Sequence, residues 1–506
     1  MGRTLAIASL LPALLLLSAC REVGAFLDAS PPPFTYDTLL VHHLVQEQTD
    51  RTPVRMYADR YLRKAWTDSV FLWISPDGVS PEADALLEHL AKPQGQGIDT
   101  AWFHTAIIRR DVDDLRSRIT EGITRDSVDT LLARIEFGLT RALLRYACGQ
   151  RYGFVRPRLL MNRQLLEETP SGTMRYRRTF DIPCEEPTDS FAQEVLASVR
   201  KARVAELLAD VQPGGDLYRL LQQDHLQALA QGDSARAHLA RINMERARWR
   251  YPRPQGGKHI WVNLAGFTLT AVDTERGDTL CMKVCGGDKR HKTPLLISHM
   301  SHVEFNPYWV IPQSIVRKEI VPHHLGDSAY FARNRILAIK KSTREEVDPT
   351  LLSAAELRSA RYMLRQERGE GNSLGRMVFR FPNDFAVFLH DTNNRKAFLR
   401  TNRAVSHGCV RLEKPLELAL FLLAESDELA IDRIRMSIDL PPRSKRGQAY
   451  QERNPEAQPL KWKRFPEGIP LWLDYYTLYP GPDGQLQEHP DSYGYDTALE
   501  EALNAL

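Results

Sequence analysis

One cysteine and two histidines stand out as groups that could carry out nucleophilic chemistry. Cys409 directly follows Gly408, and a glycine lets the backbone approach a substrate closely. A thiol attacks as its thiolate, so a nearby base must take the proton. His390 ends an apolar segment (385–389) that predicts a strand, and His407 lies two residues before Cys409, which on a strand is the same face. The pattern predicts acyl transfer by Cys409, with either histidine as the base.

Two other interpretations of these side chains have less support. A lone cysteine is most often a small buried apolar residue. Zinc binds histidine and cysteine, so His390, His407 and Cys409 could in principle form a metal site. The sequence has no C-x-x-C or H-E-x-x-H spacing to support one. We therefore expect no metal and no cofactor.

The composition is that of an ordinary globular protein. A chain of 506 residues is too long for one core, which predicts two or three folding units. The net charge of +3 is small for this length, which argues against a nucleic-acid-binding protein. Nothing in the composition indicates the oligomeric state.

The N-terminus has the pattern of a secretory signal. Arg3 precedes a short apolar run that ends in Leu17-Ser18-Ala19-Cys20. These four residues resemble the bacterial lipobox, in which the cysteine becomes the lipid-modified mature N-terminus. The alternative is a plain signal peptide with an incidental cysteine. We expect lipidation at Cys20 and a soluble body held at a membrane by the N-terminal lipid, since no other segment is long and apolar enough to span one.

The remaining cysteines do not indicate a disulfide-rich fold. Cys281 and Cys285 lie in a segment that predicts a strand, where four residues span about 13 Å. A disulfide needs a Cα separation below about 7 Å, so these two should not pair. Pairing of Cys148 with Cys184 cannot be judged from the sequence.

Hydrophobic spacing changes character near residue 252. Before it the pattern is helical, most clearly over 131–146. After the Pro- and Gly-rich stretch 252–257 the apolar residues alternate, which predicts strands. The segment 322–372 interrupts this β pattern and is charged and mostly helical. The predicted strands are 259–264, 267–271, 279–285, 377–381, 385–389 and 469–476.

The residues around Cys409 resemble the signature of a known family. His390-Asp391-Thr392 followed by Ser406-His407-Gly408-Cys409-Val410-Arg411 resembles the L,D-transpeptidase catalytic domain (YkuD-type), and in particular its multidomain YcbB-like branch. Further stretches similar to that branch are Lys292-Thr293-Pro294, Phe305 to Pro312, Asn372 to Gly375, Asp491 to Asp496 and, more weakly, Tyr152 to Pro157 and Asn243 to Arg246. A separate peptidoglycan-binding module before residue 250 is not evident.

The resemblance implies an α+β architecture. An N-terminal α-helical scaffold domain should precede a mainly-β, YkuD-like sandwich catalytic domain with a helical lid insertion. The expected segments are a lipoprotein signal peptide (1–19), a tether (20–37), the scaffold domain (38–255), the catalytic domain (256–506) and the lid (322–372).

The resemblance also assigns roles within the site. Cys409 would attack the carbonyl of the third residue of a peptidoglycan stem peptide and expel the terminal D-alanine, with His390 as base. The Asp391 carbonyl would orient the His390 ring. The supporting set is Asp391, Ser406, His407, Gly408 and Arg411, and amides near Gly408 and Cys409 could bind the oxyanion.

Lower-ranked candidates for substrate binding lie in and beside the lid. Arg358, Arg361, Arg365 and Arg368 would form one basic stripe if the segment is helical, and this stripe either meets stem carboxylates or is a solvated face. Tyr308 and Trp309 either line the cleft or belong to a core. The substrate-binding candidates are Tyr308, Trp309, Arg361, Arg365 and Asn372.

The sequence therefore predicts an L,D-transpeptidase in the cell envelope, on the periplasmic face, with the outer membrane favoured over the inner one. The same Cys–His site would also serve an L,D-carboxypeptidase or endopeptidase, or an enzyme that attaches or releases envelope proteins. A non-catalytic peptidoglycan-binding envelope protein is the alternative from a different class. The identity of the acceptor is not determined by the sequence.

Overall fold

The computed structural model describes residues 35–506 apart from 67–69, 93–94, 119–124, 170–171 and 360. The predicted signal peptide, the lipidation at Cys20 and most of the tether lie outside the described residues. The chain divides into two compact units. The first comprises residues up to Phe154, residues 187–212 and Leu506, and the second comprises residues 155–186 and 213–505.

The first unit is built from helices around one long central helix, α5 (Arg125–Tyr152). The sequence predicts a helix over 131–146, and α5 confirms it with Ile135, Leu139 and Leu143 all fully buried. A buried ion pair joins Arg145 of this helix to Asp59, with Nε–Oδ1 at 2.7 Å. The elements around it are α2 (Thr38–Arg51), η1 (Tyr57–Lys64), β1 (Ile74–Ser75), β2 (Gly78–Val79), α3 (Pro81–Ala91), η2 (Thr100–Phe103), α4 (Thr105–Arg118), α7 (Asp189–Arg200) and α8 (Val204–Asp210).

The second unit contains a sheet that closes on itself. Its strand order is β14-β15-β17-β8-β7-β6-β18-β9-β5, and a further pairing of β14 with β9 joins the two sides. The α+β class predicted from the sequence is confirmed. The strands are β5 (Phe180–Asp181), β6 (Lys258–Asn263), β7 (Thr268–Asp273), β8 (Asp278–Gly287), β9 (Leu295–Phe305), β14 (Met377–Arg380), β15 (Leu389–His390), β16 (Ala404–Ser406), β17 (Val410–Leu412) and β18 (Trp462–Asp474).

One predicted strand is much shorter in the structure. The sequence predicts a strand over 385–389, whereas β15 is limited to Leu389 and His390. The Asn383 side chain accepts hydrogen bonds from the amides of Phe385 (3.0 Å) and Val387 (3.2 Å), and Ala386 has φ +53°. This local turn competes with strand pairing, so His390 is reached by a loop rather than by a long strand.

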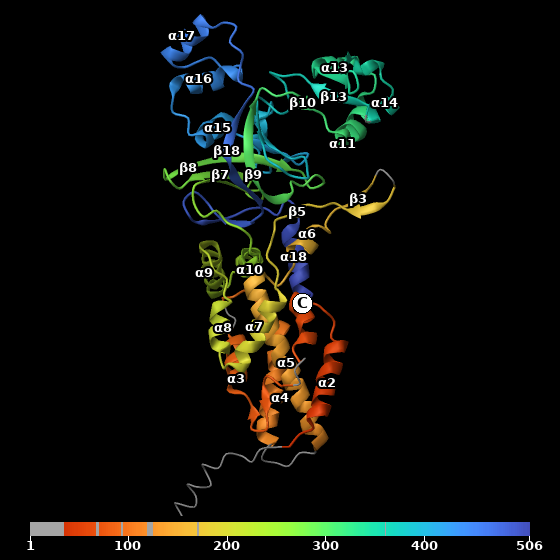
Figure 1. Ribbon diagram of the computed structural model, residues 1–506, viewed down its shortest axis with the longest axis vertical. Coiled ribbons are helices and arrows are strands. Elements are labelled where there is room, and N and C mark those ends of the chain that lie inside the picture. Colours follow the sequence, from red (N-terminus) through yellow and green to blue (C-terminus); the bar gives the residue numbers. More distant parts are fainter. Residues whose placement is uncertain (1–34, 67–69, 93–94, 119–124, 170–171, 360) are drawn as a thin grey trace, which may run out of the picture. The chain divides into compact units, whose positions relative to one another are not determined.

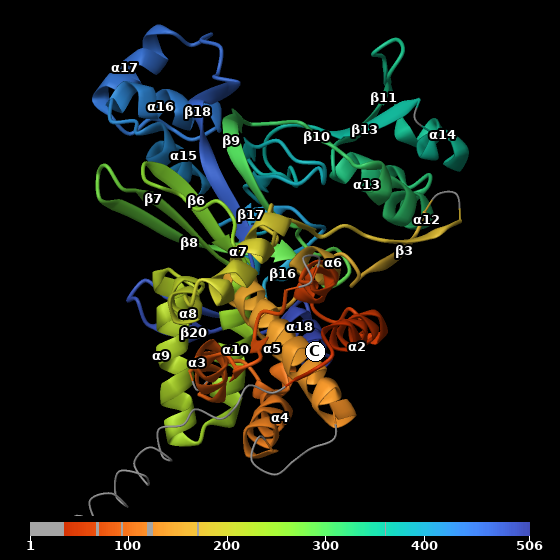
Figure 2. The same ribbon diagram turned by 60° about the horizontal axis from the view of Figure 1, so that its bottom comes forward.

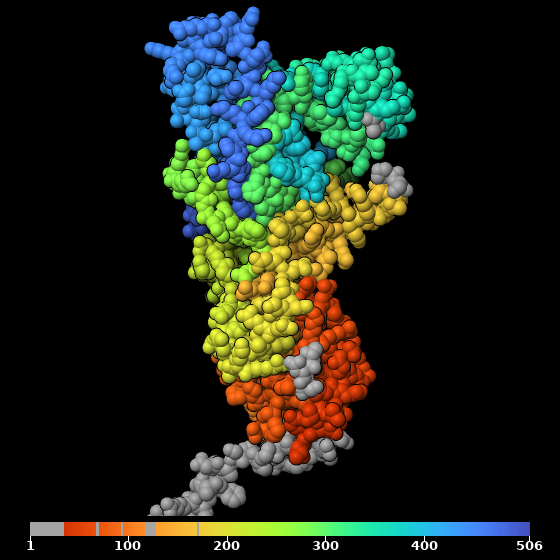
Figure 3. All heavy atoms as spheres, in the orientation of Figure 1, coloured from red at the N-terminus to blue at the C-terminus, as the bar shows by residue number. Residues whose placement is uncertain are grey.

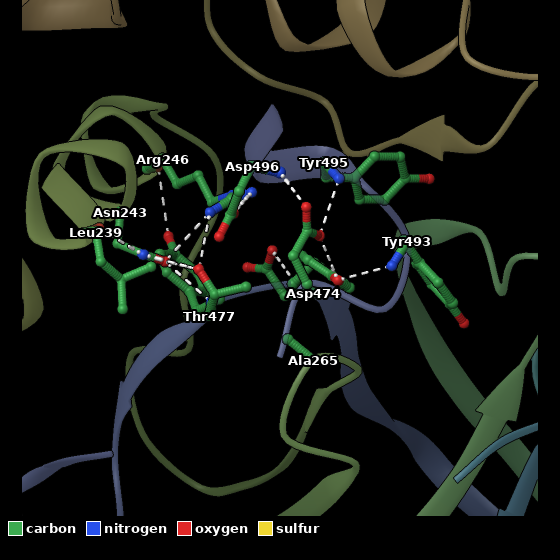
Figure 4. A network of polar contacts seen from close by, with 12 residues as sticks. Leu239, Asn243, Arg246, Ala265, Asp474, Thr477, Tyr493, Tyr495 and Asp496 are labelled. Atoms are coloured by element: carbon green, nitrogen blue, oxygen red, sulfur yellow. Dashed lines mark hydrogen bonds and ion pairs between the residues drawn. The ribbon is translucent and has the colours of Figure 1, made fainter. Parts of the chain in front are cut away.

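Two helices within the predicted scaffold domain pack in the second unit. These are α9 (Asp216–Gln231) and α10 (Ser234–Arg248). Figure 4 shows how α10 is attached to the segment that follows β18. Asn243 Nδ2 donates to Thr477 Oγ1 (2.9 Å), Asn243 Oδ1 accepts from the Thr477 amide (3.0 Å), and Arg246 pairs with Asp496 at 2.6 Å. The two compact units are defined by packing and do not divide at residue 255. They therefore do not test the predicted domain boundary at 255/256, which stays a prediction.

A segment between β9 and β14, residues 309–366, forms a small subdomain that we call the insertion. Its four-stranded sheet has the order β10-β13-β11-β12, and it has its own core around Val316, Phe331 and Leu364. Its elements are β10 (Trp309–Val310), α11 (Gln313–Ile315), η3 (Val316–Ile320), α12 (Val321–His324), α13 (Ser328–Arg333), β11 (Ile336–Lys340), β12 (Glu346–Val347), η4 (Pro349–Leu351), α14 (Ala354–Arg358) and β13 (Tyr362–Gln366).

The structure of the insertion shows that one expectation, a helical stripe of basic residues, is wrong. The sequence predicts a helical stripe of Arg358, Arg361, Arg365 and Arg368, but residues 362–366 form the strand β13. The strand pairs with β10 and β11, because the apolar residues around Leu364 are needed for the core of the insertion. The four arginines therefore do not share one helix face.

Three helices lie beside β18 in Figures 1 and 2, away from the insertion. They are α15 (Pro415–Leu423), α16 (Glu428–Ser437) and α17 (Lys445–Arg453). Within the described residues, no helix combines the length and the apolar character needed to cross a bilayer. The remaining elements are α6 (Pro157–Met161), β3 (Leu166–Glu168), β4 (Met174–Tyr176), η5 (Arg395–Leu399), β19 (Leu478–Pro480), β20 (Leu486–Glu488) and α18 (Tyr495–Asn504).

Candidate active site

Strand register brings His390 and Cys409 together. Strands β15 and β17 are parallel neighbours in which His390 pairs with Arg411 and Leu389 with Val410. Paired residues of adjacent strands point to the same face, and so do residues two apart on one strand. Cys409 lies two residues before Arg411, so its side chain is expected on the same face as that of His390. The Val410 amide donates to the Phe388 carbonyl at 2.9 Å, which extends the pairing to the residues beside the thiol.

His390 has the properties of a general base. Its side chain is buried, with 4% exposed, and Nδ1 lies 2.5 Å from the Asp391 carbonyl oxygen. Nδ1 must donate this bond, which leaves Nε2 without a proton. Burial lowers the pKa of His390 to about 4, and Arg411 acts in the same direction, whereas the carbonyls of Asp391 and Leu374 act against it. At neutral pH the ring is therefore a neutral imidazole that can accept a proton.

Asp391 is held on three sides, which fixes the carbonyl that orients His390. Its amide donates to the Met377 carbonyl (2.8 Å) and its Oδ2 accepts from the Arg376 amide (2.9 Å). Gly375 has φ +64°, and a Cβ at this position would lie 2.5 Å from the carboxylate of Asp391. Only glycine fits both the backbone conformation and this contact.

Cys409 is partly exposed and protonated at rest. Burial raises the pKa of its thiol, while the Phe388 amide, Arg380 and Arg411 act to lower it. These groups favour the thiolate once a proton has been removed. The resting pair is thus a neutral thiol and a neutral imidazole, so the thiol would need a base to take its proton before it could attack.

Ser406 holds the turn that presents Cys409. Its hydroxyl accepts from the Gly408 amide (3.1 Å) and donates to the Cys409 carbonyl (2.5 Å). Gly408 has φ +115°, which favours glycine. The Gly408 amide is therefore occupied by Ser406 and does not serve as an oxyanion donor in this arrangement, which corrects one expected role. The Cys409 amide stays a candidate for that role.

His407 has a different environment from the one expected of a base. The residue lies in the turn and not on a strand, and its side chain is exposed. Its Nε2 is 2.8 Å from Oε1 of Glu319 in η3, and its ring lies 4.6 Å from the ring of His291. His407 therefore links the turn at residues 406–409 to the insertion, and of the two histidines considered, His390 has the environment that suits a base.

Two arginines lie on the face that carries His390. Arg411 is partly buried, burial lowers its pKa, and its Nε has no hydrogen-bond partner among the described residues. Arg380 stacks on the Phe388 ring at 4.2 Å and pairs with Glu304 at 2.9 Å. Arg380 was not predicted from the sequence. The signal that could have found it is a basic residue within the apolar predicted strand 377–381. Both guanidinium groups can stabilise negative charge that develops near the thiol.

Most of the lower-ranked substrate candidates serve the insertion and its junction with the sheet. Trp309 packs on the core of the insertion, and Arg365 stacks on Tyr308 at 4.3 Å while it pairs with Glu346 and Glu367. The Arg361 side chain is exposed. The contacts of Tyr308, Trp309 and Arg365 are therefore with the insertion and not with Cys409.

Asn372 is a turn residue. It is fully buried. Its Nδ2 donates to the carbonyls of Glu367 (2.9 Å) and Pro307 (3.2 Å), and its Oδ1 accepts from the Leu374 amide (2.8 Å). Because every polar atom of the side chain is used by backbone groups, direct substrate binding by Asn372 is not supported.

The other cysteines among the described residues are free thiols. Cys285 pairs in register with Arg411 but is buried against Ala397 and Phe398, where it acts as a core residue. Cys148 and Cys184 are also free, and burial raises the pKa of each to about 12. Within the described part of the chain, no group of three or more histidine, cysteine or acidic side chains is arranged to hold a metal ion.

Comparisons with known proteins agree with this geometry. Residues 257–431 match the YkuD family, described as the L,D-transpeptidase catalytic domain, and residues 55–224 match the Scaffold domain family. A Haemophilus influenzae protein named "Putative L,D-transpeptidase" is 26% identical over 318 residues, which cover 62% of this chain and 60% of that protein. The chain thus matches somewhat less than two thirds of the length of this relative.

Proposed function

We propose that this chain cross-links peptidoglycan stem peptides through Cys409. It belongs to the L,D-transpeptidase family, because it has a YkuD-type catalytic domain preceded by a Scaffold domain. The observation that carries the proposal is the buried, neutral His390 whose Nδ1 faces the Asp391 carbonyl. That arrangement leaves Nε2 as the proton acceptor on the strand next to Cys409. The similarity to the named relative is further support.

The first half-reaction forms a thioester. Nε2 of His390 takes the Cys409 proton while the sulfur attacks the carbonyl carbon of the third stem residue. The imidazolium that forms is stabilised by the carbonyls of Asp391 and Leu374. The negative charge on the tetrahedral oxygen is met by the Cys409 amide and by the nearby guanidinium groups. His390 then donates its proton to the leaving nitrogen, the C–N bond breaks, and D-alanine leaves as its amine.

The second half-reaction transfers the acyl group. An amine of a neighbouring stem attacks the thioester carbon and gives its proton to His390. The C–S bond breaks, and the thiolate recovers the proton from the imidazolium. The products are a new amide that joins two stems at their third residues and a regenerated neutral pair. Water in place of the amine would give an L,D-carboxypeptidase with the same residues.

We place this activity on the periplasmic face of the cell envelope, with the chain anchored through a lipid on Cys20. The support is the Leu17-Ser18-Ala19-Cys20 pattern. Replacement of Cys20 by serine should release the protein from membranes or leave the signal uncleaved. A soluble mature form with an unmodified N-terminus would contradict the anchor.

The proposed reaction is tested by incubating the purified full chain with tetrapeptide muropeptides and separating the products by chromatography and mass spectrometry. We expect dimers joined through their third stem residues together with free D-alanine. A β-lactam of the carbapenem class, which acylates this family, should add its mass at Cys409. Release of D-alanine without dimers would indicate the carboxypeptidase, and absence of both products would reject an enzymatic role in favour of a binding protein.

A further inference from the structure

The second unit contains a groove outside the Cys409 site. It encloses about 310 Å³ and is bordered by the end of β9, by α16 and α17, by residues 454–461 and by Arg368. Figure 3 shows the α16–α17 region in blue at the upper left, on the opposite side from the teal insertion. None of the proposed catalytic side chains lines this groove, so the reaction above leaves it without a role.

The walls of the groove are held in place by partly buried hydrogen bonds. Ser437 Oγ accepts from the Leu460 amide (2.8 Å) and donates to the Arg433 carbonyl (2.7 Å), which fixes the 454–461 wall to α16. Asp432 accepts from the amides of Arg443 and Ser444 (both 2.8 Å), which fixes the turn into α17. The groove is therefore a preformed surface, and a ligand would lose little affinity to ordering of its walls.

The charge of the lining is unbalanced. Arg368, Arg433 and Lys461 line the groove, and Asp439 is the one acidic side chain in the described lining. Asp439 is already neutralised, because it pairs with Arg376 and accepts from Asn306 Nδ2 (3.0 Å). Among the described residues, none of the three lining cations has a carboxylate partner. Arg368 and Arg433 stack on the rings of Tyr308 (4.1 Å) and Tyr450 (5.7 Å), contacts that do not neutralise their charge. A preformed surface with cations that lack carboxylate partners favours a ligand that carries carboxylates.

The uncharged part of the lining indicates what else the ligand contains. Gln451, Asn454 and Gln458 supply side-chain amides, and Met436 and Tyr450 supply small apolar surfaces. Amides match the hydrogen-bonding groups of a peptide backbone. An uncharged glycan would leave the cations without partners. The ligand class that satisfies both parts of the lining is an acidic peptide.

A short series of hydrogen bonds connects the groove to His390, the proposed base. The amide of Asn306, which lines the groove, donates to the Arg376 carbonyl at 2.6 Å. The Arg376 amide in turn donates to Asp391 Oδ2 at 2.9 Å, and the Asp391 carbonyl orients His390. A peptide held in the groove is therefore bound to the same rigid frame as the catalytic pair.

We propose that this groove binds the carboxylate-bearing stem peptide of a second peptidoglycan strand, separately from the stem that reacts at Cys409. The choice of a stem peptide as the acidic peptide rests on the proposed function. The groove then retains the enzyme on its substrate between reactions, and its contribution depends on the charge of the stems.

The test measures binding of a synthetic stem tetrapeptide to the full chain carrying Cys409→Ala. The double substitution Arg433→Glu with Lys461→Glu reverses two charges of the groove. The control is Lys445→Glu, since Lys445 is exposed on α17 but does not line the groove. We expect the dissociation constant to rise about tenfold or more in the double variant and less than about twofold in the control. The same peptide with its carboxylates converted to amides should not bind the groove.

An unchanged dissociation constant in the double variant, equal binding of the amidated peptide, or tighter binding of a peptide-free glycan would overturn the proposal. Both substituted side chains are exposed, so an unchanged melting temperature confirms that the double variant folds. Acylation by a carbapenem, measured in parallel with Cys409 present, separates the two hypotheses. Absence of acylation in the wild type contradicts the proposed function, whereas normal acylation with unaltered peptide binding in the double variant contradicts the groove alone.

Discussion

Two histidines of the active-site region, His390 and His407, show how one side chain takes different roles in different surroundings. His390 is buried and its Nδ1 faces a backbone carbonyl. His407 is exposed and paired with the carboxylate of Glu319 from the insertion. Burial lowers the pKa of the first ring and keeps it neutral, whereas the second ring lies at the surface beside an acidic side chain.

The two histidines also differ in how firmly their positions are fixed. The position of His390 depends on backbone groups of the sheet, which are rigid. The position of His407 depends on a side-chain contact with the insertion, which can be broken at small cost because both partners are about half exposed. The comparison leads us to expect that the sheet fixes the proposed base, and that the insertion influences the turn at residues 406–409.

The largest effect is expected at the catalytic pair. Cys409→Ala should abolish cross-linking, and His390→Ala should lower the rate of Cys409 acylation by at least about 10³-fold, because the thiol stays protonated without its base. The two losses should not add. His407→Ala, by contrast, should keep most of the activity. Equal losses for the two histidine variants, measured by acylation kinetics, would remove the distinction between them.

The second largest effect is expected from substitutions in the backbone around Asp391, whose carbonyl orients His390. Gly375→Ala forces a Cβ to within 2.5 Å of the Asp391 carboxylate at a positive φ, and should cost about 2–4 kcal/mol of unfolding free energy. Gly371→Ala is the matched control, since Gly371 has φ +84° but no atom within 4 Å of the added Cβ; it should cost about 1 kcal/mol. Urea denaturation of both variants measures the difference, and similar values would show that the Asp391 contact is not tight.

The pH dependence of folding stability should distinguish the buried ring of His390 from a histidine with an ordinary pKa. An unfolded histidine titrates near 6.5, while the pKa of His390 is lowered to about 4 by burial. The unfolded chain binds the extra proton in this window, so the stability from neutral His390 is present above pH 6.5 and is lost as the pH falls toward 4. The loss should be roughly 3 kcal/mol, from 1.36 kcal/mol per unit.

Unfolding titrations between pH 7.5 and 4.5 should show this slope in the wild type and less of it in His390→Gln. The acid limb of Cys409 acylation should lie well below 6.5. An acid limb near 6.5 would show that the base is not the buried His390.

The contact between the insertion and the nucleophile turn should have a smaller effect. Glu319→Gln keeps the hydrogen-bonding shape but removes the charge that faces His407. We expect a loss of about two- to fivefold in the ratio of dimer to hydrolysed tripeptide, because a looser turn admits water to the thioester. Glu346→Gln, which removes another exposed ion pair of the insertion, is the control. An identical ratio in both variants would show that the Glu319 contact does not influence partitioning.

The smallest effect is expected at Arg361. Its side chain is exposed, and β13 places Arg365 in a different setting, so the two do not act as one basic surface. Arg361→Glu should change KM for stem peptides by less than about twofold. A larger increase in KM, measured with purified muropeptides, would restore a substrate-binding role for this residue.

The chemistry of the site was predictable because it depends on residue types that are rare in combination. A glycine–cysteine pair in a Ser-His-Gly-Cys-Val-Arg run and an upstream histidine after an apolar segment are enough to indicate a cysteine acyltransferase. Local alternation likewise predicts β6, β7, β8 and β14, since a half-buried strand needs an apolar residue at every second position. The helix over 131–146 follows from its spacing of three and four in the same way.

Tertiary structure decided the points that depend on partners distant in sequence. The contrast between His390 and His407 follows from register and burial, because only the fold buries the first ring beside β17 and sets Glu319 of the insertion against the second. The strand at 362–366 replaces the expected helix because the core of the insertion requires β13 between β10 and β11. Arg380 belongs to the site, and Asn372 does not, for the same physical reason: a side chain's role is set by which groups surround it, and those groups come from separate strands and turns.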